Sequence, residues 1–295
     1  MTARFKIICL FLFLAWPAVV HAYIPVISEG QVKVDKALLR QDVEFLSDSL
    51  CGGRAAGSPA SFDAASYICR RLRDMGYPFE IQSFSTGSGK VGHNIVSVPA
   101  AGAKSLTLVM AYYDGLGVLE GTLYPGADSN ASGVAALLAL ADRLKGRGDV
   151  LIAFLDGHNA GMSGSAALQE ALRGRKLSMV VNLDILGGTL APVDKYWPDY
   201  LIALGAERYS KTFEKCNEGL MLHLYYDYYR SRSFTDLFYR RIGDHRGFLS
   251  GGVPVIMFTS GITLNTNRPD DTASTLDYEV FSRRVEFIAR FLERR

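Results

Sequence analysis

Short apolar runs alternate along this chain with segments in which apolar residues recur every three or four positions. The runs predict buried strands, and the spaced segments predict amphipathic helices. The runs lie at 79–84, 94–98, 106–110, 151–155, 179–183, 200–204 and 253–259. The helical segments lie at 35–46, 65–75, 134–144, from 162 onward, near 211 and at 281–292. This alternation predicts an α/β fold: a three-layer α/β/α sandwich around a mixed, mostly parallel central sheet.

The beginning of the chain has a different pattern. An apolar run at 7–20 follows two basic residues, and the small residues at 20–22 have the spacing of a signal-peptidase site. Pro17 interrupts this run, which is shorter than the ~20 residues that a membrane-spanning helix needs. We predict that residues 1–22 are a signal peptide and that residues 23–295 form a single domain. The protein is then secreted or periplasmic, with no membrane anchor after cleavage.

Composition narrows the range of partners. Without the two basic residues of the signal, 30 basic residues face 30 acidic ones, which excludes the basic excess of a nucleic-acid-binding protein. The mature chain keeps Cys51, Cys69 and Cys216. Export permits a disulfide, for which Cys51 and Cys69 are the favoured pair, and buried unpaired thiols are the alternative.

Polar side chains follow the ends of successive predicted strands. Because the carboxyl ends of parallel strands meet at one edge of a sheet, we expect these side chains to share a crevice. They are Tyr112, Asp114, Asp128 to Asn130, His158, Asn159, Asp184, Asn267, Asp270 and Asp271.

Three other interpretations of this region find little support. Ser163 stands at a predicted helix start and not in a nucleophile elbow. The stretch at 126–135 lacks the lysine of a phosphate loop, and the glycosylation tripeptide at Asn130 falls among the crevice residues.

Seven motifs in order make the chain resemble metallopeptidase family twenty-eight, which holds di-zinc aminopeptidases and is related to glutaminyl cyclases. The resemblance implies the fold of a zinc aminopeptidase over nearly all of the mature chain. The motifs are GGRAAGS (52–58), AYYDG (111–115), GADSNASGVA (126–135), FLDGHNAGMSGS (154–165), NLDILGG (182–188), GDHRGF (243–248) and NRPDDT (267–272).

Three site positions of the family are kept. Asp128 falls on the bridging aspartate and Asp184 on a ligand of the first zinc, and Asp114 falls on the residue that orients a histidine ligand. The other positions are substituted. Tyr112 and Asn267 stand where the family has histidine ligands.

The family's Glu-Glu pair is substituted as well. His158 stands at the general-base position, and Asn159 stands at a carboxylate ligand of the second zinc. A zinc site needs about three Cys, His or carboxylate ligands, so this set does not hold two zinc ions about 3.5–4 Å apart. As a general base, His158 would have to deprotonate a water that no metal has acidified and whose pKa is ~15.7.

A structural role is therefore the favoured interpretation of the substituted residues. We expect His158 to donate to Asp128 or Asp184, and Tyr112 to fill the space of the missing metal and ligand. Asn159 and Asn267 would help to satisfy the two aspartates. The aromatic stretch at 222–229 either borders a substrate pocket or forms an edge strand.

Three hypotheses of function follow. The favoured one is an inactive exported homologue, without a cofactor, that binds a peptide, an amino-terminal group or another ligand in the degenerate crevice. The alternative is an active aminopeptidase or cyclase with one metal ion on Asp128, Asp184 and His158. A hard-cation site is the third, because two carboxylates and two amide oxygens suit Ca²⁺ or Mg²⁺ better than zinc.

Overall fold

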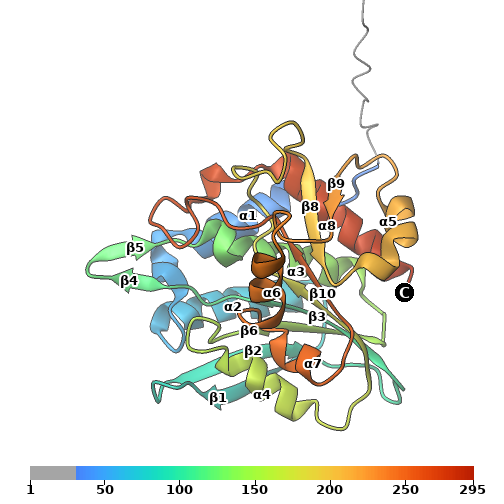
Figure 1. Ribbon diagram of the computed structural model, residues 1–295. Coiled ribbons are helices and arrows are strands. Elements are labelled where there is room, and N and C mark those ends of the chain that lie inside the picture. Colours follow the sequence, from blue (N-terminus) through green and yellow to red (C-terminus); the bar gives the residue numbers. More distant parts are fainter. Residues whose placement is uncertain (1–30) are drawn as a thin grey trace, which may run out of the picture.

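The central element of the computed structural model is an eight-stranded mixed sheet (Figure 1). The structure describes residues 31–295, so the predicted signal peptide lies outside the described residues. The strand order is β1-β2-β6-β3-β7-β10-β8-β9, and β6, β3, β7 and β10 run parallel to one another. The strands are β1 Phe79–Ser85, β2 Val91–Ser97, β3 Leu106–Tyr112, β6 Val150–Leu155, β7 Leu177–Leu183, β8 Tyr200–Leu204, β9 His223–Tyr225 and β10 Val255–Thr259.

Alternating side chains of the central strands face two separate cores. On β3, Val109 and Ala111 pack into the larger core beneath one helical layer. Leu108, Met110 and Tyr112 point to the opposite face and the smaller core. Every residue of β3 is buried, as expected for a parallel strand covered on both sides.

Helices cover both faces of the sheet, which makes the predicted three-layer sandwich. The larger core is covered by α1, α2, α3, α5 and α8 (Figure 1). On the opposite face of the sheet, α4 and α7 cover the smaller core and the strands β1 and β2, and α6 lies next to α7. The helices are α1 Lys36–Ser47, α2 Pro59–Asp74, α3 Gly133–Arg143, α4 Ser163–Ala171, α5 Ser210–Cys216, α6 Arg232–Arg240, α7 Arg246–Ser250 and α8 Tyr278–Glu293.

Elements that the apolar pattern did not predict are short or exposed. The hairpin of β4 (Gly117–Leu119) and β5 (Thr122–Tyr124) projects from the body of the molecule (Figure 1). Helices α6 and α7 and the short helical turns η1 (Ser49–Arg54), η2 (Ala127–Ser132), η3 (Glu207–Tyr209) and η4 (Ala273–Thr275) were also missed. Most of these segments are too short to show a period, and α6 buries none of its residues.

Two alternatives that the sequence left open have an answer in the structure. Cys51, Cys69 and Cys216 are free, buried thiols. In the aromatic stretch at 222–229, only β9 (His223–Tyr225) forms an edge strand beside β8, and Tyr228 accepts a hydrogen bond from the Ile262 N–H of the loop after β10. Between residues 31 and 295, no helix is long and apolar enough to cross a membrane.

Candidate functional site

The candidate site consists of Tyr112, Asp114, Asp128, His158, Asn159, Asp184 and Asn267, the positions that the motifs single out. Tyr112 ends β3, His158 follows β6 and Asp184 follows β7, so three adjacent parallel strands bring these residues to one edge. Contacts join them: the Tyr112 ring stacks on His158, and the Tyr112 hydroxyl lies 3.3 Å from Ser129 Oγ. Asn267 Oδ1 accepts a hydrogen bond from the same serine at 3.4 Å.

His158 is held between an aromatic ring and a carboxylate. Its ring lies 3.8 Å from the Tyr112 ring, centroid to centroid, with the planes 9° apart. Its Nδ1 lies 2.7 Å from Asp244 Oδ2, and Asp244 is only 2% exposed. The expected hydrogen bond from His158 to Asp128 or Asp184 is therefore wrong, because the loop before α7 places a third carboxylate at the imidazole. His158 is fixed in place by these two contacts.

Asp114 holds the turn that carries His158 and Asn159. Its two carboxylate oxygens accept the backbone N–H groups of His158 at 2.8 Å and Asn159 at 2.9 Å. The Asn159 amide also donates to Asp114, at 3.2 Å. Asn159 thus satisfies Asp114, and not Asp128 or Asp184 as expected, because the side chain folds back on its own turn.

Asp128 lies in a cradle of backbone groups. Its Oδ1 accepts hydrogen bonds from the Gly187 N–H at 2.7 Å and from Ser132 Oγ at 3.1 Å. A Cβ atom on Gly188 would collide with its Oδ2, so the chain covers that oxygen closely. Asp271 accepts the N–H groups of Asp128 and Ser129 at 2.7 and 3.0 Å and so fixes the backbone on the other side.

Burial raises the pKa of all three family carboxylates. Removal from water raises the pKa of Asp128 to about 7, and the nearby Asp271 adds to the rise. Burial likewise raises the pKa of Asp114 and of Asp184 to about 6, although the charge of His158 opposes both shifts.

At the imidazole of His158, the neighbouring charges outweigh burial in setting the pKa. Burial lowers the pKa of His158, but Asp244, Asp184 and Asp114 outweigh it and raise that pKa to about 9. Its charge in turn outweighs burial at Asp244 and lowers the pKa of that carboxyl. His158 is therefore a cation at neutral pH that lies among the carboxylates.

Two buried arginines fix the loops beneath these residues. Arg54 donates to the carbonyl oxygens of Tyr113, Pro125 and Gly126 at 2.8 to 2.9 Å. Arg284 donates to the carbonyl oxygens of Tyr200, Leu186 and Gly188 at 2.7 to 2.8 Å. Both side chains are 0% exposed, so they hold the loops around Asp128 through the backbone.

The donor set does not fit the two zinc ions that the family uses. Within residues 31–295, no group of three or more His, Cys, Asp or Glu side chains is placed to hold a metal ion. The Tyr112 and His158 rings are stacked on each other, His158 Nδ1 faces Asp244, and Oδ1 of Asp128 is occupied by Gly187 and Ser132. These contacts take up positions 112 and 158 and one oxygen of Asp128, and the remaining carboxylates are too few to hold a zinc pair.

Three residues of the site were not predicted. Asp244 stands inside the quoted motif GDHRGF, but no strand end or spacing connects it with His158. Arg54 stands inside GGRAAGS, and Arg284 interrupts the apolar stripe of α8 between Phe281 and Ile288. A charged residue at an apolar position of a helix is the signal that could have identified Arg284.

Asn130 is a structural residue. It is 0% exposed, and its side-chain amide donates to the carbonyl oxygens of Tyr112 and Leu183 at 3.2 and 3.0 Å. A buried and fully engaged amide is not available as a glycosylation acceptor, in agreement with the low weight given to the tripeptide.

Solved structures share the fold of this chain, which is the fold of zinc aminopeptidases. The zinc aminopeptidase BSAP of Bacillus subtilis superposes with a TM-score of 0.71 at 13% identity, over 89% of this chain and 95% of that one. The LapA aminopeptidase of Legionella pneumophila gives 0.70 at 15% identity, over 90% and 73%. The glutaminyl cyclase of Porphyromonas gingivalis gives 0.67 at 17% identity, over 88% and 98%.

The family follows from the sequence match. A sequence model of peptidase family M28 matches residues 94–292, and the chain belongs to this family. The alkaline phosphatase isozyme conversion protein of Escherichia coli (strain K12) is 29% identical over 114 residues, 32% of this chain and 33% of that protein. The match thus spans about a third of that relative. The family and the fold predicted from the motifs are confirmed.

Proposed function

We propose that this chain is a non-hydrolytic member of peptidase family M28, exported from the cell, that binds the free amino terminus of a peptide or a similar ligand at the candidate site. The observation that carries the proposal is the unit formed by Tyr112, His158 and Asp244. In it, a ring stack and a buried ion pair stand where the family has a metal ligand and its general base.

The chemistry of these residues supports binding and not hydrolysis. A catalytic base needs a pKa near the operating pH in order to accept a proton, whereas the pKa of His158 is raised to about 9 by its carboxylate neighbours. His158 is already protonated at pH 7. It neutralises buried carboxylates, a role that a metal cation has in a di-zinc site.

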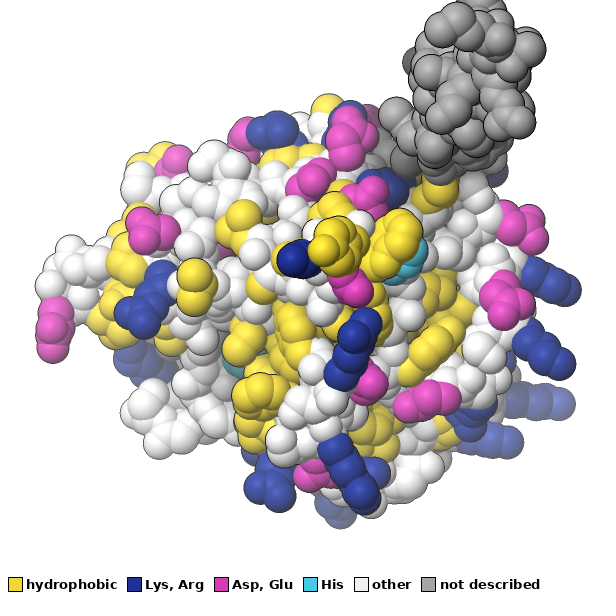
Figure 2. Space-filling model, turned by 45° about the horizontal axis from the view of Figure 1, so that its top comes forward, with side chains coloured by type: hydrophobic (Ala, Val, Ile, Leu, Met, Phe, Trp, Pro, Cys, Tyr) yellow, Lys and Arg dark blue, Asp and Glu magenta, His cyan; other side chains and the backbone are white. Residues whose placement is uncertain are grey.

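The surroundings of the site favour a ligand with an apolar part. The loops after β7 and β10 expose Leu190, Trp197, Ile262 and Leu264. Figure 2 shows hydrophobic side chains gathered over the middle of the face seen there, with many Lys and Arg side chains at its margins. Asp184, at 9% exposure, offers a carboxylate for an ammonium group at the edge of the site.

Metal analysis together with a peptidase screen tests the inactive part of the proposal. The protein is incubated with zinc, dialysed and assayed on amino-acid anilides and dipeptides. We expect no stoichiometric zinc and no hydrolysis that a chelator abolishes. The matched control is the variant Tyr112→His/His158→Glu/Asn159→Glu/Asn267→His, which restores the family ligands and is expected to bind about two zinc ions per chain.

Chelator-sensitive hydrolysis by the unaltered protein would overturn this part. The variant Asp128→Asn would then show whether a single ion on Asp128 supports the turnover, because loss of a carboxylate ligand should abolish it. Melting temperatures with Ca²⁺, Mg²⁺ and chelator decide the hard-cation hypothesis, and equal values exclude it.

Calorimetric titration tests the binding part. The probes are Leu-Gly-Gly and its N-acetylated form, which differ in the ammonium group. We expect the free tripeptide alone to bind, and Asp184→Asn to weaken that binding about ten-fold, the usual effect of losing a charged hydrogen bond. Equal binding of both probes, or of neither, contradicts the assignment.

A further inference from the structure

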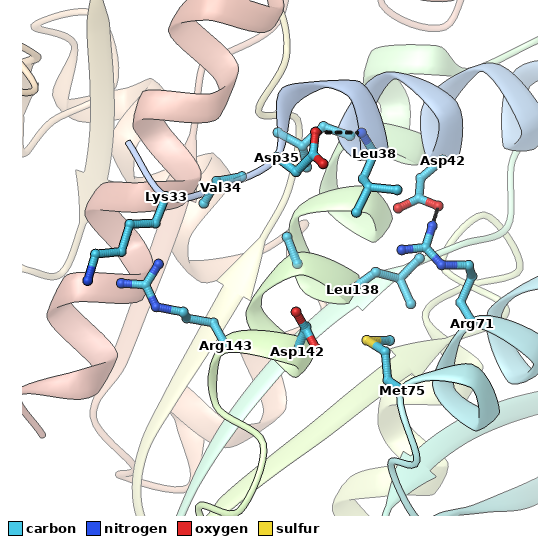
Figure 3. A pocket seen from close by; sticks show the side chains of 12 residues that line it. Lys33, Val34, Asp35, Leu38, Asp42, Arg71, Met75, Leu138, Asp142 and Arg143 are labelled. Atoms are coloured by element: carbon cyan, nitrogen blue, oxygen red, sulfur yellow. Dashed lines mark hydrogen bonds and ion pairs between the residues drawn. The ribbon is translucent and has the colours of Figure 1, made fainter. Parts of the chain in front are cut away.

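The side of α2 that faces away from the core is a surface that the candidate site does not use. The helix packs inward on α3 and β2, and none of its residues belongs to the candidate site. Its Arg71 is also turned inward, because it pairs with the buried Asp42 of α1 (Figure 3). The exposed side chains on the opposite side of the helix form what we call the α2 face: Phe62, Asp63, Ser66, Arg70 and Arg73.

The α2 face carries opposite charges on the two sides of its middle. Asp63 lies one helical turn before Ser66, and Arg70 lies one turn after it. Arg70 lies over the ring of Tyr67, at 5.8 Å from its centroid. Within residues 31–295, the ion pair of α2 is that of Arg71 with Asp42, and the charges of Asp63 and Arg70 have no partner there.

A groove runs along each side of the α2 face. Between α2 and the strands β1 and β2, a groove of about 330 Å³ is lined by Phe62 and Ile81. Between α2, the end of α1 and η1, a groove of about 560 Å³ is lined by Phe45 and Leu50. Ser66 lines both grooves, so this small residue stands on the ridge that separates them.

Both grooves expose large apolar side chains to solvent. Leu50 is 88% exposed, Ile81 56% and Phe62 51%. Such residues are unremarkable when they stand singly, but several of them around one ridge form a patch of the kind that marks a protein–protein contact. The α2 face and its grooves thus combine an apolar surface with unpaired charges of both signs.

We propose that the α2 face is the contact between two copies of this chain, related by a two-fold axis that passes next to Ser66. The two α2 helices then lie antiparallel, and Asp63 of each copy meets Arg70 of the other. A two-fold axis also brings each groove onto the same groove of the partner, so Phe62 and Ile81 of the two copies pack together. A parallel arrangement would place like charges opposite one another, which is unfavourable.

The shape and size of the α2 face suit this dimer. A serine at the crossing point allows two helices to approach to an interaxial distance of ~8 Å. The 16 residues of α2 form a helix ~24 Å long. With one neighbouring element ~10 Å wide on each side, the contact covers on the order of 700 Å² per copy. Stable interfaces bury ~800 Å² per partner. The dimer does not depend on the function proposed for the candidate site.

Sedimentation equilibrium of the purified protein tests the proposal. We expect a dimer, and we expect Asp63→Arg or Arg70→Asp alone to raise its dissociation constant about ten-fold or more, because each change brings like charges together. The double variant Asp63→Arg/Arg70→Asp restores opposite charges and should recover the dimer. Lys211→Asp, an exposed charge reversal on α5, is the matched control and should have no effect.

Two results overturn the proposal. One is the mass of a single chain at the highest soluble concentration, and the other is a dimer that neither single variant weakens. Circular dichroism of each variant shows whether the monomer is still folded, which the exposure of both side chains leads us to expect. Recovery in the double variant cannot result from damage to the fold.

A cysteine at the crossing point locates the two-fold axis. A side chain bonds to its own copy only where the two Cα atoms lie within about 7 Å, so Ser66→Cys should give a covalent dimer on mild oxidation. Ser233→Cys, exposed on α6 at the opposite face of the sheet, is the matched control and should not. Cys51, Cys69 and Cys216 are buried and do not compete. Equal cross-linking of the two variants, or none in Ser66→Cys, contradicts the proposed axis.

Discussion

The two halves of the candidate site, around Asp128 and around His158, differ in which of the family's residues this chain keeps. Around Asp128, hydrogen bonds hold the loop backbone. Asp271 accepts two backbone N–H groups, and the Gly187 N–H and the Ser132 hydroxyl donate to Asp128. Around His158, side chains that would bind metal are replaced by a stacked ring and a buried ion pair. Asp114 and Asp128, which bind the loop backbone, are thus kept together with Asp184, whereas the residues at positions 112, 158, 159 and 267 are exchanged.

The largest effect is expected at the rebuilt half. Asp244→Ala removes the partner of the His158 cation, and breaking such a buried pair should lower the free energy of unfolding by about 3 kcal/mol. Denaturant titration measures it. The double variant Asp244→Ala/His158→Gln should recover part of the loss, because no unpaired cation remains. A loss below about 1 kcal/mol would show that the pair does not hold this half together.

The pH dependence of that loss sharpens the test. The pKa of His158 is raised to about 9 in the folded protein, above its unfolded value of about 6.5. The stabilisation is therefore fully present below pH ~6.5 and disappears as the pH rises through 9. The cost of Asp244→Ala should fall accordingly in alkaline solution.

A smaller loss is expected at the retained half. Asp271→Asn leaves one oxygen for two buried N–H groups, which should cost about 2 kcal/mol. Asp270→Asn is the matched control, since Asp270 is the exposed neighbour and its change should cost less than about 0.5 kcal/mol. Equal effects of the two variants would mean that Asp271 does not shape the loop.

The smallest effect should have the opposite sign. The pKa of Asp128 is raised to about 7 by burial, so its ionisation destabilises the folded protein as the pH rises from about 4 to 7. Asn cannot ionise and can still accept from Gly187 and Ser132. Relative to the parent, Asp128→Asn should therefore gain about 1 kcal/mol of stability when the pH rises from 5 to 6. Melting temperatures that stay parallel across this range would contradict the expectation.

The sequence predicted the strands and the place of the site because both depend on local patterns. Apolar runs marked β3, β6, β7 and β10, and the rule for parallel strands brought Tyr112, His158 and Asp184 to one edge. The partner of His158 was not predictable in this way. Asp244 reaches the imidazole only because of the path of the chain before α7, and no periodicity encodes that path.

The hydrogen bonds from Arg54 and Arg284 to the loops have a consequence for how this sequence can evolve. Both guanidinium groups bind carbonyl oxygens, which every amino acid supplies. A substitution that leaves the path of the backbone unchanged therefore keeps the anchoring contacts, whereas Gly126 and Gly188 have no room for a Cβ atom. Away from these two glycines, the side chains of the loops can change, and the chemistry of the site with them, while the arginines still hold the backbone.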